Sequence, residues 1–268
     1  MVSLPGSWFA ERVTNGRDAL SAQAPDIVAI FDSIAGLPAP EVTDPAVAEF
    51  VEQFSLDVSS LDADQRTAFF AATGADAFGV VQRVYAADFV PRVRSVLDAV
   101  LGAGPWPDPV PYDGDSWALL ESFMTAVARL RAVDVTTTEL VRLRGARLHD
   151  CAVCKSRRSQ DAIDAGADDT AFAAVDRWPD SDLPDTTKAA LALVDALVET
   201  PYAVPAATVE RVRTHLSETE IVEVVLDVMR NAANKIAVAL GADAATVTEG
   251  VELFTTDLDG NLAVVGQR

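Results

Sequence analysis

Apolar residues recur at spacings of three and four along most of the chain, which is the pattern of amphipathic α-helices. The helices that this pattern predicts cover Ile27–Ile34, Val47–Phe54, Thr67–Val84, Val90–Leu101, Trp117–Arg131, Leu140–Leu148, Lys188–Val198 and Ile221–Leu240. Proline and glycine residues such as Pro45, Gly166 and Gly241 separate these runs. We find no convincing run of alternating apolar and polar residues, so the sequence predicts an all-α protein.

A segment rich in proline and glycine divides the helical pattern in two. Residues 101–115, LGAGPWPDPVPYDGD, hold five Pro or Gly residues in their first nine positions, which favours a boundary between two helical regions. We therefore predict an N-terminal helical region over 1–110 and a second domain over 111–250. The first region stays unassigned, with a degenerate repeat of the second as one interpretation. Residues 251–268 are predicted to form a tail, irregular from Asp257 onward.

Two stretches 81 residues apart resemble each other at the start of a predicted helix. Thr136-x-x-Glu139 and Ser217-x-x-Glu220 both have the form of a capping box, and a fainter third copy begins at Asp62-x-x-Gln65. The match is compatible either with an internal duplication or with well-capped but unrelated helices.

Composition and charge exclude several classes of protein. The 268 residues are 50% hydrophobic and 23% charged, which is typical of globular chains and not of disordered ones. A net charge of −20 repels phosphate backbones and anionic lipid headgroups, so we expect neither nucleic acid nor membrane as a partner. The apolar stretches are also too short for a membrane span.

The two cysteines and the first residues favour a cytoplasmic protein. Two cysteines are too few for a secreted disulfide scaffold, and the start, MVSLPGSWFAERV, lacks the features of a secretory leader.

Most of the unusual chemistry is concentrated between residues 138 and 166. Both cysteines, Cys151 and Cys154, lie there with His149, in a stretch that also holds six basic residues between Glu139 and Arg158. Arg142, Arg144 and Arg147 are alternatively the solvated face of the helix from Glu139, paired with the abundant carboxylates. If Asp150 caps a helix that runs to about Ala165, both thiols lie in its first turn, where the helix dipole and nearby guanidinium groups lower a thiol pKa.

That helix would also place Arg158 beside the thiol. Cys154 and Arg158 are four residues apart and share a face with Ala162. Because a buried guanidinium needs a carboxylate partner, we expect Arg158 to pair with Glu139.

The arrangement resembles a known family. Glu139, eleven further residues, Cys151-x-x-Cys154 and a small-residue helix ending at Gly166 resemble the AhpD-like, carboxymuconolactone decarboxylase family of all-α proteins, over about residues 116–242. The resemblance implies a thiol-dependent hydroperoxide reductase in which Cys154 attacks a small organic hydroperoxide, Cys151 resolves the product to a disulfide, and Glu139 relays protons. It further implies a homo-oligomer, a thiol or dithiol reductant of unknown identity, and no cofactor.

One position departs from the family pattern. The family usually has histidine four residues after the second cysteine, where this chain has Arg158. Arginine stays protonated and cannot act as a general base, although its charge could hold Cys154 as thiolate. His149 is the candidate to replace the missing histidine, with a capping or solvated role as the alternative.

Other readings of the same residues stay open. A non-redox enzyme of the decarboxylase type would need a histidine or an acid at the active centre, and a catalytically decayed helical oligomeric or interaction protein would have ordinary thiols. The second half of a structural zinc site is missing, so we expect no metal. Asn231 and Asn234 are expected to bond locally or to solvent.

Overall fold

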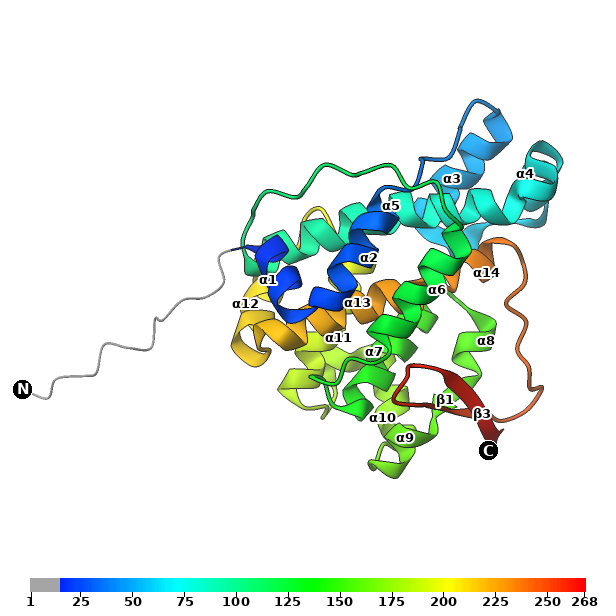
Figure 1. The fold of residues 1–268 in the computed structure, drawn as a ribbon. Coiled ribbons are helices and arrows are strands. Elements are labelled where there is room, and N and C mark those ends of the chain that lie inside the picture. Colours follow the sequence, from blue (N-terminus) through cyan, green and yellow to red (C-terminus); the bar gives the residue numbers. More distant parts are fainter. Residues whose placement is uncertain (1–14) are drawn as a thin grey trace, which may run out of the picture.

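The computed structural model describes residues 15–268, and the chain start that argued against a secretory leader lies outside that range. The helices are α1 (Gly16–Gln23), α2 (Pro25–Ala35), α3 (Pro45–Asp57), α4 (Ala63–Thr73), α5 (Ala77–Leu101), α6 (Ser116–Val127), α7 (Val135–Leu148), α8 (Ala152–Lys155), α9 (Gln160–Asp164), α10 (Asp169–Ala174), α11 (Asp185–Glu199), α12 (Ala206–His215), α13 (Glu218–Ala232) and α14 (Lys235–Ala239) (Figure 1). Short 3₁₀ turns cover Val58–Ser60, Gly74–Asp76 and Val175–Asp180. A small sheet consists of β1 (Arg157–Ser159), β2 (Glu252–Thr256) and β3 (Leu262–Gln267). The prediction of an all-α protein is therefore confirmed, with this sheet as its one addition among the described residues.

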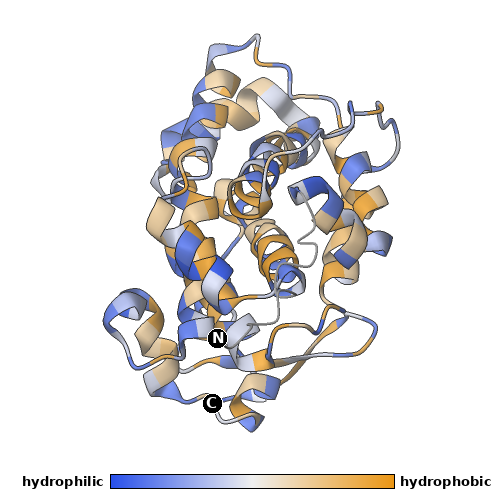
Figure 2. Ribbon diagram, turned by 90° about the vertical axis from the view of Figure 1, so that its left-hand side faces the viewer, coloured by the Kyte–Doolittle hydropathy of each residue, from blue (hydrophilic) through white to orange (hydrophobic). Residues whose placement is uncertain are grey.

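The core is built around α11 and α13, which pack against each other and each against α5 and α7. Every residue of α13 from Ile221 to Met229 is buried, as expected of a helix that is surrounded by others. Most of the other helices carry both hydrophilic and hydrophobic residues (Figure 2), which matches the amphipathic pattern read from the sequence.

The proline-rich segment separates helices along the chain but does not separate the core. Residues 102–115 form no helix or strand between α5 and α6. One hydrophobic cluster nevertheless extends from Ala19 to Ala239, because α2 packs on α6 and α5 packs on α13. The division at 101–115 thus stays a prediction from the sequence.

Several helix boundaries differ from the predicted ones, and the predicted helix Ile221–Leu240 is divided into α13 and α14. The run Thr67–Val84 is interrupted at Gly74, whose φ of 56° lies in the left-handed region that glycine adopts without strain. After this break α5 continues through Pro91, although proline removes one helical hydrogen bond. The buried side chains on both sides of it, among them Phe89 and Val93, hold the helix against the core.

Two of the three expected capping boxes are present, at Asp62–Gln65 and at Ser217–Glu220. At α7 the N-cap is Asp134, whose side chain accepts a hydrogen bond from the Thr137 amide at 2.9 Å. Thr136 is therefore inside the helix, and Glu139 is not the capping glutamate that the pattern predicted. Its carboxylate is free for contacts elsewhere in the fold.

The helix expected from Asp150 to Ala165 does not exist as one piece. Asp150 has a φ of 52°, Cys151 takes the N-cap position of α8, and α8 ends at Lys155. Residues 157–159 are extended as β1, and α9 begins only at Gln160. The prediction was wrong because β1 pairs in parallel with β2, about a hundred residues further along the chain.

The C-terminal tail is also more regular than expected. Strands β2 and β3 form an antiparallel hairpin, which lies beside β1 in Figure 1. The turn between them is organised by Asp257, whose carboxylate accepts bonds from the backbone amides of Asp259 and Asn261. The stretch Asp257–Asn261 between two short apolar runs is a hairpin signal that the sequence analysis missed.

Candidate functional site

A cavity of about 500 Å³ lies next to the cysteine pair. Its walls come from α6, the start of α7, the segment from α8 to α9, the C-terminal end of α13, and the β2–β3 hairpin. The lining residues that can take part in chemistry include Cys154, Glu139, Arg142 and Arg157. Apolar side chains such as Val127, Leu130 and Phe254 also line the cavity. The elements that enclose it come from far apart in the sequence.

The two cysteines differ in their access to this cavity. Their Sγ atoms lie at bonding distance, 2.15 Å, and their Cα atoms are 5.3 Å apart. Cys154 lines the cavity with 6% of its surface exposed, whereas Cys151 is fully buried. Cys154 is therefore the cysteine that a molecule in the cavity could reach, and Cys151 lies directly behind it.

Glu139 lines the same cavity as Cys154, and its partner is Arg142 in place of the expected Arg158. Its carboxylate is 2% exposed and accepts two hydrogen bonds from the Arg142 guanidinium, at 2.6 and 2.7 Å. A third bond comes from the Ser159 amide at 3.2 Å. Paired donors of this kind satisfy both carboxylate oxygens.

Arg142 connects this carboxylate to the cysteine segment. It also donates to the carbonyl oxygens of Cys154 and Arg157, both at 2.9 Å. From the sequence, Arg142 was left either among the basic residues near the thiols or on the solvated face of its helix. Its position three residues after Glu139, one helical turn away, was the signal that could have identified the pair.

Arg158 does not occupy the position that was expected of it. It donates to the carbonyl oxygens of Lys155 and Arg157 and lies over the ring of Phe172 at 5.3 Å. Burial lowers the pKa of its guanidinium, and the neighbouring charge of Arg142 lowers it further. The predicted Arg158–Glu139 pair was wrong because Arg158 lies on a strand and not on the thiol face of a helix.

His149 is not among the residues that line the cavity. It is buried, with its ring edge-on to Phe89 at 6.3 Å. Burial, together with the charges of Lys235 and Arg92, lowers its pKa from 6.5 to about 3. Its Nε2 has no hydrogen-bond partner among the described residues. The structure records no contact between the His149 imidazole and either cysteine.

Asp243 is a site residue that no pattern in the sequence indicated. Its carboxylate accepts a bond from the Ala152 amide at 2.7 Å, and its carbonyl accepts one from the Val153 amide at 2.8 Å. Asp243 thus holds the short helix that carries Cys154, from a position 91 residues away in sequence.

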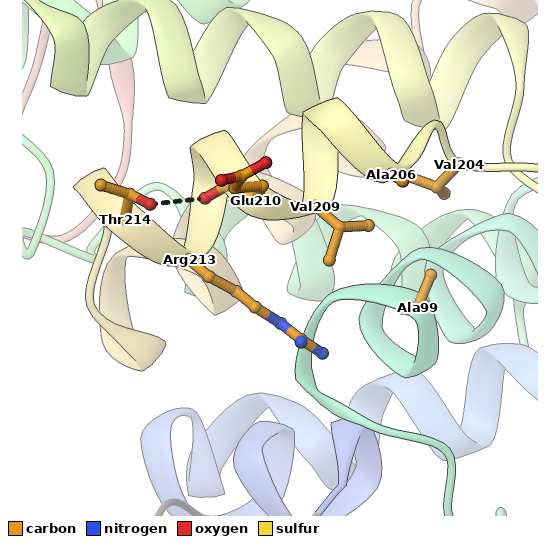
Figure 3. A pocket seen from close by; sticks show the side chains of 7 residues that line it. All are labelled: Ala99, Val204, Ala206, Val209, Glu210, Arg213 and Thr214. Atoms are coloured by element: carbon orange, nitrogen blue, oxygen red, sulfur yellow. Dashed lines mark hydrogen bonds between the residues drawn. The ribbon is translucent and has the colours of Figure 1, made fainter.

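A second hollow, of about 670 Å³, lies between Ala99 near the end of α5 and helix α12 (Figure 3). It is shallow and open, and the Arg213 side chain crosses it to donate a hydrogen bond to the Val100 carbonyl. None of the candidate residues from the sequence lines it. The cavity at Cys154 is therefore the candidate functional site.

Within residues 15–268 no group of three or more His, Cys, Asp or Glu side chains is placed to hold a metal ion. No helix in the same range is both long and apolar enough to cross a bilayer.

Fold and site together define an all-α protein with a Cys-x-x-Cys pair whose second cysteine lines a cavity. The chain is 48% identical over 223 residues to a Mycobacterium tuberculosis protein, named "Uncharacterized protein Rv2313c" in strain H37Rv and "Uncharacterized protein MT2376" in strain CDC 1551; the match covers 80% of this chain and 78% of the relative. The protein belongs to the family of this mycobacterial protein. It is also 29% identical over 126 residues to "Uncharacterized protein YdfG" of Bacillus subtilis, covering 46% of this chain and 86% of that protein. No family model and no solved structure matches the chain.

Proposed function

We propose that the protein is a thiol-dependent hydroperoxide reductase that uses Cys154 and Cys151 as a redox pair. The observation that supports this most is the arrangement of the sulfurs: Cys154 lines a cavity large enough for an organic molecule, and Cys151 lies at bonding distance behind it. The resemblance to AhpD-like proteins is a second argument for the same chemistry.

The proposed reaction has three steps. The Cys154 thiolate attacks the terminal oxygen of the hydroperoxide, the O–O bond breaks, and the alkoxide takes a proton and leaves as the alcohol. The Cys151 thiol then attacks the Cys154 sulfenic acid, which forms the disulfide and releases water. An external dithiol reopens the disulfide by thiol–disulfide exchange. The cytoplasm keeps thiols reduced, and we place the protein there, as a homo-oligomer.

Arg142 and Glu139 are assigned to positioning in this proposal. The Arg142 guanidinium links the Glu139 carboxylate to the carbonyls of Cys154 and Arg157. In this way the pair fixes the backbone that carries the attacking sulfur. In this proposal no histidine takes the place of the family's histidine in the proton relay. The proton for the leaving alkoxide comes from solvent or from another group in the cavity.

The proposal is tested by mixing the fully reduced protein rapidly with a small excess of cumene hydroperoxide and following thiol loss. We expect the wild type to lose two thiols much faster than free cysteine does. Cys151→Ser should lose one thiol and accumulate a sulfenic acid that dimedone traps, and Cys154→Ser should be inert. Reaction of all three proteins at the rate of free cysteine would overturn the proposal.

A further inference from the structure

Strand β3 is the edge of the small sheet, and its outer side has no neighbouring strand. The sheet order is β1-β2-β3, so β3 is paired on one side only. The Thr256 amide of β2 donates to Asp161 at 3.2 Å, away from β3. Residues opposite each other in an antiparallel ladder either bond to each other or both turn away. Leu262, which lies opposite Thr256, therefore turns its N–H and C=O groups to the outer edge.

Val264 has the same orientation, because it lies two residues further along β3, opposite Phe254. Between residues 15 and 268, no hydrogen bond from outside the sheet reaches the backbone of Leu262 or Val264. Val265 has no partner in β2, because the register shifts at this point. The regular part of the open edge is therefore the stretch 262–264.

The side chains of β3 are exposed and mostly apolar. All six residues of the strand are exposed, and the exposed fractions of Leu262, Val264 and Val265 are 47%, 54% and 52%. The strand contains no charged residue and no proline. Proteins commonly protect an open edge with residues of these two kinds. Strand β3 is therefore suited to pairing with another strand.

The charge of the chain favours a second copy through this strand and opposes one elsewhere. With 41 acidic and 21 basic residues, two copies repel each other over most of their surfaces. The uncharged β3 is an exception to this repulsion. Two β3 strands are also self-complementary when they run antiparallel about a twofold axis.

We propose that β3 pairs with β3 of a second copy of this chain, antiparallel and centred on Ala263, so that one sheet runs through the dimer. Leu262 of each copy then exchanges two backbone hydrogen bonds with Val264 of the other. Leu262 also lines the cavity at Cys154. Because opposite residues share a face of the sheet, Val264 of the second copy extends the cavity wall beside Leu262.

The proposal is tested by sedimentation equilibrium of the full chain over the micromolar range, where we expect the wild type to dimerise. Val264→Pro removes the outward N–H and leaves the bonds between β2 and β3 in place. The dissociation constant should rise about thirty-fold, because two symmetry-related hydrogen bonds are lost. Val264→Glu covers the case in which the proline variant folds poorly. It should weaken the dimer about tenfold or more, because it places a carboxylate against an apolar side chain.

A matched control adds the same charge elsewhere. Val42 has a similar exposed fraction, 50%, and Val42→Glu should leave the dissociation constant unchanged. A wild type that stays monomeric would overturn the proposal, as would equal constants in the wild type and both Val264 variants, or equal weakening by Val42→Glu. The measurement needs no hydroperoxide, so an active peroxidase that is monomeric would refute the β3 dimer and leave the proposed function standing.

Cross-linking tests the register of the pairing. In the oxidised protein Cys151 and Cys154 are joined, so an introduced cysteine supplies the free thiol. Ala263→Cys places two thiols directly opposite each other, with Cα atoms about 4.5 Å apart, and should form a disulfide-linked dimer on mild oxidation. Gln267→Cys should not, because its two copies would lie about 27 Å apart along the paired strands. Cross-linking of both variants, or of neither, would contradict the pairing.

Discussion

At the scale of single residues, a cluster of buried charged side chains lies around Asp88 in α5. Its carboxylate accepts bonds from Arg92 at 2.7 Å and from Lys235 at 2.9 Å. All three residues are less than a tenth exposed. Burial lowers the pKa of Lys235, and the Asp88 carboxylate opposes that shift. The cluster therefore depends on a single acid that serves two cations.

Replacing that acid should destabilise the fold strongly. Asp88→Asn leaves Arg92 and Lys235 buried without their counter-charge, so we expect the free energy of unfolding to fall by about 3–5 kcal/mol, measured by urea denaturation. Asp76→Asn is the matched control, because Asp76 pairs with Arg83 at an exposed site and should cost at most about 1 kcal/mol. Equal losses in the two variants would contradict this interpretation.

His149 makes stability depend on pH. Its pKa is about 3 in the folded protein and 6.5 in the unfolded chain, so between these values the unfolded state binds the additional proton. Stability therefore falls as the pH drops from 6.5 toward 3, by up to about 1.4 kcal/mol per pH unit from this residue.

This dependence is measured against a variant without the imidazole. The difference in unfolding free energy between the wild type and His149→Gln, from urea denaturation between pH 7 and pH 4.5, should shift in favour of the variant as the pH falls. A difference that stays constant over this range would show that the fold does not lower the pKa of the imidazole.

At the scale of elements, the β2–β3 hairpin connects the C-terminus to the redox segment. The Glu252 amide donates to the Ser156 carbonyl at 2.8 Å, and β2 continues in register along β1. Phe254, Leu258 and Leu262 of the hairpin also line the cavity. The last residues of the chain therefore form a wall of the site.

Gly260 fixes how closely this hairpin approaches α6. A Cβ at Gly260 would lie 2.3 Å from the Thr125 carbonyl oxygen, and its φ of 85° is strained for any other residue. Gly260→Ala should therefore loosen the hairpin. If the substitution destabilises the hairpin packed against α6 by about 1.4 kcal/mol, the fraction of molecules with the hairpin detached rises about tenfold.

The reactivity of the Cys154 thiol reports whether the hairpin has loosened. In the reduced protein, the rate of alkylation of Cys154 by iodoacetamide should rise about tenfold in Gly260→Ala. Gly266→Ala is the control, because a Cβ there meets nothing within 4 Å. Identical alkylation rates in the two variants would show that the hairpin does not limit access to the thiol.

At the scale of the whole molecule, the helices before and after residues 101–115 share one core. Helices α6 and α13 bury apolar surface against α2 and α5, and a fragment without the first 110 residues would expose it. We therefore expect the full chain to unfold in one cooperative transition and the fragment 111–268 to lack a stable fold. Circular dichroism with urea titration checks both, and a fragment that unfolds cooperatively would support two domains.

Helix positions were largely predictable because local patterns determine them. Periodicity identified the runs that became α2, α3, α6, α11 and α13, and the capping boxes at Asp62 and Ser217 form as their spacing indicates. The hairpin signal at Asp257–Asn261 was present in the sequence and was overlooked. The break in the predicted helix after Lys155 had no local signal.

The sequence by itself determined the helical class, the nearness of Cys151 to Cys154, and the candidacy of Glu139, since each depends on residues close together along the chain. Only the tertiary structure decided that Arg158 donates to backbone carbonyls and not to Glu139, that His149 lies beside the buried Lys235 cluster, and that Nδ2 of Asn231 is buried without a hydrogen-bond partner in the described part of the chain. These contacts follow from the pairing of β1 with β2 and the packing of α13 on α7. Partners that lie about a hundred residues apart leave no periodic trace in the sequence.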